Sequence, residues 1–280
     1  MSGTLYLVAT PIGNLEDITL RALRVLREVE LVACEDTRQT RKLLEHYGIH
    51  KPTLSYHEHN EALRAEELVE KLREGARVAL VSDAGTPLVS DPGYRLVTKA
   101  IESGIAVEPI PGPSALLAAL SASGLPTDSF RFGGFLPARP SARRKLLASL
   151  ESETATVIFY EAPHRILETL ADIEELLGAR PVVLARELTK IHQEFLRGTA
   201  AELRQALAAR RGIKGEITLL IGRAAPPAES SGSQRDPREL ETEVQTLLSG
   251  GMDRMEAIKA VARRHGMSKR ELYRLLTPRE

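Results

Sequence analysis

Small residues, prolines and carboxylates are concentrated in the segment Ser82–Gly93, which reads SDAGTPLVSDPG. Gly85 permits a positive φ or a close approach of the backbone to a ligand, and the two prolines stiffen the path. Asp83 is the last residue of a predicted buried strand, so its carboxylate could accept hydrogen bonds from an amine or from hydroxyl groups. We interpret residues 83–86 as ligand-binding and Asp91 as the N-cap of the helix that follows.

Two further loops combine proline, glycine and small polar residues. Thr10–Asp17 (TPIGNLED) directly follows the first predicted strand, and Pro111–Ala115 (PGPSA) opens an Ala/Leu-rich helix. Backbone N–H groups at such places can face a ligand. The first loop lacks the glycine spacing of a Rossmann fingerprint or a P-loop and, taken alone, is better explained as a plain turn. Helix-start chemistry explains the second about as well as ligand binding does.

Three charged segments follow other predicted strands: Glu35–Arg38 (EDTR), Phe159–Arg165 (FYEAPHR) and Arg186–His192 (RELTKIH). A carboxylate or a histidine at such a position could take a proton, and a cation could stabilise negative charge. Helix caps and solvated loops are the alternative explanation for all three segments.

Short apolar runs, which we interpret as strands, precede these loops. Amphipathic runs, which we interpret as helices, alternate with the apolar runs. This pattern predicts an α/β fold with largely parallel sheets, whose ligands bind at the carboxyl ends of the strands. The predicted strands are Leu5–Ala9, Leu31–Glu35, Thr53–His57, Val78–Asp83, Ala106–Pro109, Phe130–Phe135, Thr156–Tyr160, Pro181–Glu187 and Glu216–Gly222.

The composition narrows the class of protein. The chain has 280 residues, and 38 Lys and Arg balance 38 Asp and Glu, so any nucleic acid must be bound by a local patch rather than by bulk charge. A single cysteine, Cys34, excludes an internal disulfide and a cysteine-rich zinc site, and the histidines show no metal-site spacing. The longest strictly apolar run, Ala115–Leu120, is too short to cross a membrane. We expect a cytoplasmic protein without a bound metal, a signal peptide or a membrane partner.

The C-terminal part differs from the rest of the chain. Residues 224–238 are rich in Ala, Pro, Ser and Gly and are predicted to form a flexible linker. Beyond it, Leu240–Leu248, Met255–Arg264 and Lys269–Leu276 are predicted helices, the last two joined as a helix-turn-helix. Eight basic and three acidic residues between Asp253 and Arg279 favour contact with a phosphate backbone. A small solvated bundle used for packing or dimerisation is the alternative.

Taken together, the motifs resemble those of a known family. These are VATPIGNLEDIT (8–19), EDTR (35–38), SDAGTP (82–87), SDPG (90–93), PGPSA (111–115), FGGFLP (132–137), FYEAPHR (159–165) and RELTK (186–190). From about Leu5 to Arg223, and in this order, they resemble the family of small-subunit (16S) rRNA cytidine 2′-O-methyltransferases, small-subunit methyltransferase I, in the tetrapyrrole-methylase fold class. Tetrapyrrole-modifying members usually carry a Gly-Pro-Gly type first loop, whereas this chain has Thr10–Asn14 (TPIGN), which weighs against a porphyrinoid substrate.

The resemblance implies two α/β domains of tetrapyrrole-methylase type with an S-adenosylmethionine (SAM) cleft between them, plus a small C-terminal helical module. We place these parts at residues 1–122, 123–223 and 239–280, with the linker at 224–238. The resemblance further implies a homodimer that methylates a cytidine 2′-hydroxyl in the decoding region of 16S rRNA in the small ribosomal subunit. By position, the SAM-binding residues would be Pro11, Asp83, Ala84, Gly85, Thr86, Ser114, Ala115, Tyr160, Gly215, Glu216 and Ile217.

Methyl transfer to a hydroxyl needs a group that removes the proton and a cation that stabilises the alkoxide. Asp36 and Glu161 are candidates for the first role, Arg38 and Lys190 for the second, and His164 is a weaker candidate base. The expected RNA-binding residues are Arg263, Arg264, Lys269, Arg270 and Arg274. A second group, Arg139, Arg143, Arg144 and Lys145, could bind RNA or form a solvated helix face.

Two other functions remain open at this point. The first is a methylase of the same fold that acts on a tetrapyrrole or a modified protein residue, against which the basic C-terminal module argues. The second is a non-catalytic nucleic-acid-binding protein with a degenerate α/β core. The density of motifs at strand ends argues against that alternative.

Overall fold

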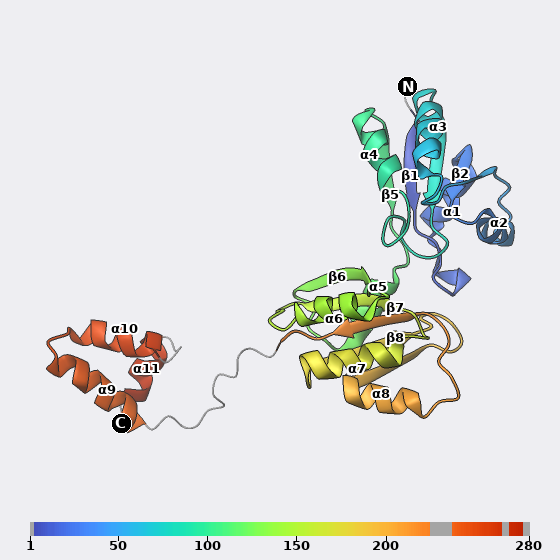
Figure 1. Ribbon diagram of the computed structural model, residues 1–280. Coiled ribbons are helices and arrows are strands. Elements are labelled where there is room, and N and C mark those ends of the chain that lie inside the picture. Colours follow the sequence, from blue (N-terminus) through green and yellow to red (C-terminus); the bar gives the residue numbers. More distant parts are fainter. Residues whose placement is uncertain (1–2, 225–236, 265–268, 277–280) are drawn as a thin grey trace. The chain divides into compact units, whose positions relative to one another are not determined.

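The structure is a computed structural model that describes residues 3–224, 237–264 and 269–276. The chain forms two compact units, Met1–Ala225 and Pro226–Glu280. The larger unit contains two five-stranded sheets, and the described part of the smaller unit is helical (Figure 1). No helix in the described ranges is both long and apolar enough to cross a membrane.

The first sheet is entirely parallel, as the sequence predicts, with the strand order β3-β2-β4-β1-β5. Alternate residues of its strands enter separate cores: Leu5 and Leu80 pack with α3 and α4, whereas Val8 and Val81 pack with α1 and α2. All strands therefore end at one edge of a sheet covered on both faces. The elements are β1 (Thr4–Val8), a 3-10 turn (Leu15–Asp17), α1 (Leu20–Glu28), β2 (Leu31–Cys34), α2 (Thr37–His46), β3 (Thr53–Ser55), α3 (Glu61–Arg73), β4 (Arg77–Val81), α4 (Tyr94–Glu102) and β5 (Ala106–Ile110).

The second sheet is mixed, so the expectation of largely parallel sheets is wrong here. Its order is β6-β7-β10-β8-β9, in which only β6 and β7 are parallel neighbours. Strand β9 forms an antiparallel pair with β8 and is not among the strands predicted from the sequence. The elements are α5 (Ala115–Ser123), β6 (Phe130–Phe135), α6 (Pro140–Ala148), β7 (Thr156–Glu161), α7 (Ile166–Leu177), β8 (Pro181–Arg186), β9 (Glu194–Thr199), α8 (Ala200–Ala208) and β10 (Ile217–Ile221).

The larger unit has two halves, one built around each sheet, and helix α5 connects them. Its residues Leu116 and Leu120 pack with Ile158 and Leu220 of the second sheet, and Ile12 from the loop after β1 joins the same cluster. The predicted first domain, residues 1–122, contains most of this helix. The predicted boundaries at residues 122 and 223 are not tested by this packing and stay predictions.

The smaller unit has a hydrophobic core of its own. Helices α9 (Pro237–Ser249), α10 (Arg254–Arg264) and α11 (Lys269–Leu276) bury Leu240, Val244, Ile258, Val261 and Leu272 among themselves. Asp253 caps α10 by accepting a 2.9 Å hydrogen bond from the N–H of Met255. The three predicted helices are present, while the predicted turn at residues 265–268 and most of the predicted linker lie outside the described residues.

Candidate active site

Three loops at the carboxyl ends of β1, β4 and β5 are held together by hydrogen bonds from backbone N–H groups and threonine hydroxyls. Thr10 and Gly85 exchange two N–H···O bonds of 2.9 Å each, and the Thr10 hydroxyl donates to the Ser82 carbonyl at 3.1 Å. The Thr86 hydroxyl donates to the carbonyl of Pro113 at 3.2 Å. Gly85 has a φ of 86°, a left-handed conformation that favours glycine. The motifs that the sequence analysis selected are therefore neighbours in space.

A cavity of about 410 Å³ lies where these loops meet the second half of the larger unit. Its walls combine small residues, apolar side chains and carboxylates from both halves. They are formed by Ile12, Asp83, Ala84, Gly85, Thr86, Val89, Ser90, Asp91, Ser114, Ala115, Phe135, Tyr160, Glu161, Ala162, Pro163, Gly215, Glu216, Ile217 and Thr218.

This cavity collects ten of the eleven residues that the resemblance assigns to the cofactor. Pro11 does not line it; this residue is buried next to Ile12, which does. The residues come from strand ends on both sheets, the arrangement expected for α/β ligand sites. Their contact with SAM stays a prediction.

Glu161 lies in the cavity wall with a side chain that is 0% exposed. Its Oε1 accepts hydrogen bonds from the Ala162 N–H at 2.7 Å and from Nη2 of Arg165 at 2.5 Å. Its Oε2 accepts from the Thr169 hydroxyl at 2.6 Å. Both oxygens are thus bonded within the fold, an arrangement that suits holding the loop after β7 better than accepting a substrate proton.

Asp36 caps helix α2 and forms a chelate with Arg38. Its Oδ1 accepts from the Arg38 backbone N–H at 2.8 Å, and its Oδ2 accepts from Nη2 of Arg38 at 2.9 Å. These hydrogen bonds lower the pKa of the Asp36 carboxyl to about 2. A base this weak is poorly matched to neutral pH. Neither residue lines the cavity in the described structure, although the Asp36 N–H bonds to Asp83.

Lys190 lies beside the cavity on the β8–β9 loop and bridges two carboxylates. Its Nζ donates to Glu187 Oε1 at 2.9 Å and to Glu216 Oε2 at 3.0 Å. Burial alone would lower the pKa of Lys190, but the two hydrogen bonds and the negative charges of Glu187 and Glu216 together outweigh burial and raise the pKa. The Thr189 hydroxyl on the same loop accepts the N–H of Asn14 at 3.0 Å. The loop thereby connects the two halves of the larger unit beside the site.

Asp91 is one of the cavity residues that the sequence motifs did not indicate as ligand-binding, and the prediction that it is the N-cap of α4 is wrong. Gly93 occupies the N-cap position, which has no side-chain cap hydrogen bond. Asp91 instead lines the cavity, on a loop where Leu88 and Ser90 have left-handed φ values of 71° and 66°. Burial, together with the negative charges of Glu35 and Asp83, raises the pKa of the Asp91 carboxyl to about 6.

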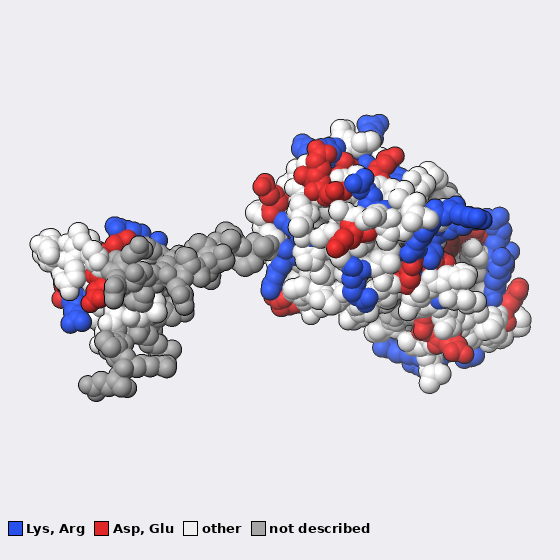
Figure 2. Space-filling model, turned by 90° about the horizontal axis from the view of Figure 1, so that it is seen from below, with Lys and Arg blue, Asp and Glu red and all other residues white. Residues whose placement is uncertain are grey.

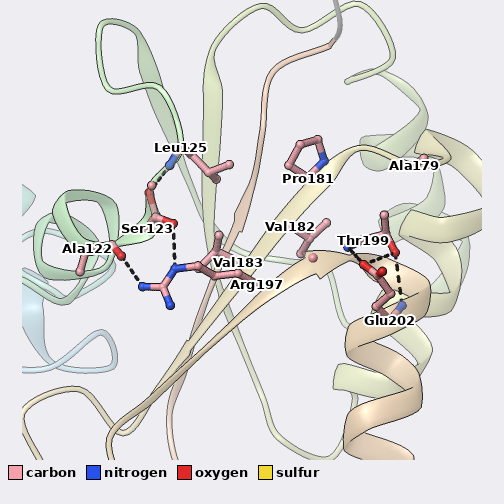
Figure 3. A pocket seen from close by; sticks show the side chains of 12 residues that line it. Ala122, Ser123, Leu125, Ala179, Pro181, Val182, Val183, Arg197, Thr199 and Glu202 are labelled. Atoms are coloured by element: carbon pink, nitrogen blue, oxygen red, sulfur yellow. Dashed lines mark hydrogen bonds between the residues drawn. The ribbon is translucent and has the colours of Figure 1, made fainter.

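A second cavity of about 580 Å³ lies between β8, β9 and the end of α5 (Figure 3). Its polar side chains are used within the fold: Arg197 donates to the carbonyls of Ala122 and Ser123, and Glu202 forms a capping box with Thr199. None of the predicted catalytic or cofactor residues lines it. The smaller cavity therefore remains the candidate active site.

The residues predicted to bind RNA differ in how exposed their side chains are. Arg143 is 2% exposed and donates to Asp172 at 2.7 Å, so the idea that it binds RNA is wrong. Lys and Arg elsewhere on the larger unit are interspersed with Asp and Glu on the face shown in Figure 2. In the smaller unit, Arg264 is exposed and pairs with Glu243 at 3.5 Å, and Lys269 is half-buried. The side chains of Arg263, Arg270 and Arg274 lie outside the described part.

A family model and a solved structure identify the class of enzyme to which this chain is similar. The family model described as Tetrapyrrole (Corrin/Porphyrin) Methylases matches residues 4–204. The structure of a uroporphyrin-III-C-methyltransferase from Thermus thermophilus is similar with a TM-score of 0.55 and 25% sequence identity, over 79% of this chain and 94% of that one. The fold and its strand-end cavity define a methyltransferase of the tetrapyrrole-methylase class.

Relatives with the name ribosomal RNA small subunit methyltransferase I narrow the class further. The protein from Halalkalibacterium halodurans is 49% identical over 98% of this chain and 94% of its own length. The protein from Synechocystis sp. is also 49% identical, over 98% of this chain and 97% of its own. The chain belongs to the ribosomal RNA small subunit methyltransferase I family.

Proposed function

We propose that this protein transfers a methyl group from SAM to the 2′-hydroxyl of a cytidine in the decoding region of 16S rRNA. The observation that carries the proposal is the convergence of the family-specific loops on one cavity formed by both halves of the larger unit. The names of the relatives support the small ribosomal subunit as the partner. A cytoplasmic homodimer is part of the same proposal.

The cavity is suited to SAM in size and chemistry. Gly85, Ala84 and Ala115 bring backbone close to the space, Ile12 and Ile217 supply apolar wall, and Asp83 and Asp91 supply negative charge. Carboxylates can accept hydrogen bonds from an amino group or ribose hydroxyls and attract a cationic sulfonium. Bound there, SAM would supply a methyl group activated by its positively charged sulfur. The protein must then orient the acceptor oxygen and manage its proton.

Among the carboxylates at the site, Asp91 combines access to the cavity with a pKa near 6. A base with such a pKa is largely ionised at neutral pH yet more basic than an ordinary aspartate. We therefore assign proton removal to Asp91, with Asp36 holding Arg38 and Glu161 holding the loop after β7. Arg38 and Lys190 remain the candidate cations for the developing alkoxide.

The basic C-terminal unit is proposed to bind the RNA backbone through Arg263, Arg264, Lys269, Arg270 and Arg274. Phosphate contacts of this kind supply affinity and register rather than sequence specificity. The cavity then selects the nucleotide whose ribose it can admit.

Methyl transfer from tritiated SAM tests the proposal directly. Unmethylated small ribosomal subunits and uroporphyrinogen III are offered in parallel, and the labelled RNA is digested to map the modified nucleotide. A label on a cytidine 2′-oxygen is the expected result. Label on the tetrapyrrole alone, or on neither substrate despite SAM binding, would overturn the proposed function.

A further inference from the structure

The strand β6 contains an irregularity that directs an aromatic side chain to the cavity. Phe132 pairs with Ile158 of β7, but the next pairing is Phe135 with Tyr160, so three steps on β6 match two on β7. An extra residue of this kind is a β-bulge, which changes the face toward which later side chains point. In a regular ladder, Gly134 would have been opposite Tyr160.

Both glycines of the sequence Phe132–Phe135 are needed for this bulge. A Cβ on Gly133 would lie 2.3 Å from the ring of the buried Phe159, so only glycine fits against that ring. Gly134 has a φ of 68°, which disfavours any residue with a side chain. Glycine inside a strand weakens the strand, so these two glycines reduce the stability of β6. In return, the bulge directs Phe135 toward the cavity.

Phe135 lines the cavity and is 59% exposed. Its ring lies 5.4 Å from that of Tyr160 at an interplanar angle of 63°, and Phe132 contacts the same tyrosine ring at 5.0 Å and 66°. Tyr160 is half-buried, so these edge-to-face contacts fix the aromatic cluster while Phe135 stays accessible. A large, exposed aromatic side chain in the wall of this cavity is a surface suited to a flat ligand.

We propose that Phe135 is the surface on which the target cytosine stacks when its ribose enters the cavity. This inference rests on the proposed function. A nucleotide whose ribose is drawn into a cavity leaves its base stack, and an aromatic side chain can replace the stacking that the base gives up. Such stacking does not depend on hydrogen bonds to the base, so Phe135 holds the nucleotide in position, and other groups must identify cytosine.

The test compares Phe135→Ala, Phe135→Leu and Phe135→Trp by steady-state methyl transfer to unmethylated small subunits. We expect the alanine variant to raise KM for the subunit about 10-fold or more, the range expected for loss of one base–aromatic stack. Leucine keeps the apolar volume but not the flat ring and should behave like alanine, whereas tryptophan should retain a KM near that of the wild type. The dissociation constant for SAM, measured by equilibrium dialysis, should change much less than the KM for the subunit in the alanine and leucine variants, although Phe135 also contacts Tyr160 of the predicted cofactor site.

Phe130→Ala is the matched control, because Phe130 is an exposed phenylalanine at the other end of β6 and does not line the cavity. An unchanged KM for Phe135→Ala would overturn the stacking proposal alone. So would full activity of the leucine variant, a parallel loss of SAM affinity, or a changed oligomeric state in gel filtration. Failure of the wild type to label the subunit would overturn the proposed function, and the stacking proposal with it.

Discussion

The backbone N–H of Asp36 donates a 3.0 Å hydrogen bond to Oδ1 of Asp83, joining the end of β2 to the end of β4. This bond joins two neighbouring strands at the carboxyl edge of the first sheet and uses one oxygen of a carboxylate that lines the cavity. Asp83 therefore has a second role besides facing a ligand, because it fixes the loop after β2, which leads into helix α2 and Arg38.

The first prediction separates these two roles of Asp83. Asp83→Ala removes both the acceptor for Asp36 and the negative charge, and we expect SAM affinity to fall by about 10- to 100-fold, as for loss of a hydrogen bond to a charged group. Asp83→Asn keeps an oxygen acceptor but not the charge, so it should preserve the loop and lose affinity by a smaller factor. Equilibrium dialysis with labelled SAM measures both variants. Wild-type affinity in Asp83→Ala would place the cofactor elsewhere.

The second prediction concerns the pH dependence of catalysis. If Asp91 removes the proton, kcat/KM should fall as the pH drops through about 6, because protonation of a carboxyl with that pKa removes the base. Asp91→Asn should lose about 100-fold or more in kcat at neutral pH and lose this limb of the profile. Asp36→Asn is the comparison, since the Asp36 pKa of about 2 predicts no change in the profile near pH 6. An Asp91→Asn enzyme with an unaltered profile would exclude Asp91 as the base.

The third prediction concerns the effect of the Asp91 carboxylate on the stability of the folded protein. The folded-state pKa of Asp91 is raised above its ordinary value, so ionisation destabilises the fold at pH above 6. Asp91→Asn should therefore raise Tm at pH 7. The gain should shrink as the pH falls from 6 to 4, because the folded-state carboxyl takes up a proton in that range, and should vanish below about pH 4, where the carboxyl is protonated in both states. Calorimetric scans across this range, with Asp128→Asn as an exposed control, measure the effect. A constant difference in Tm across the range would contradict the assignment.

Most of the fold follows from local patterns, while the second sheet shows where they stop being informative. Runs such as Phe130–Phe135 and Pro181–Arg186 are apolar enough to identify as strands, because both faces are largely covered or the run is strongly aromatic. Strand β9 (Glu194–Thr199) was missed because its six residues are only partly buried and include Glu194, Arg197 and Gly198. The antiparallel direction of β10 depends on pairing across distant segments, which periodicity does not encode.

The site shows the same division between local and long-range information. The cofactor residues were predictable because strand-end loops of an α/β fold converge, and the resemblance indicated which loops to select. Asp91 was not, because its neighbour in sequence, Pro92, suggests a helix start. Its raised pKa comes instead from burial and from Glu35 and Asp83, neither of which is adjacent in sequence. Likewise, nothing local indicates that Arg143 is buried rather than part of a basic surface.

The fourth prediction tests that buried arginine. Arg143 donates to Asp172 at 2.7 Å with a side chain that is 3% exposed, so Arg143→Ala leaves a largely buried carboxylate with fewer partners. We expect a loss of about 3 kcal/mol in the free energy of unfolding of the larger unit. Arg144→Ala removes a more exposed partner of the same Asp172 and should cost about 1 kcal/mol or less. Urea titration followed by circular dichroism measures both, and equal small losses would contradict the role assigned to Arg143.

The fifth prediction concerns RNA binding by the C-terminal unit. Arg264→Glu combined with Lys269→Glu reverses two of its charges, and the salt dependence of binding scales with the number of phosphates that the protein neutralises. We expect weaker binding to the small subunit and a slope of log K against log salt that is smaller by about 1 to 2. Arg24→Glu combined with Arg73→Glu makes the same charge change at exposed positions of the larger unit and serves as the control. If both double variants reduced the slope equally, net charge rather than a binding surface on these helices would account for the effect, and an unchanged slope would assign the helices to packing.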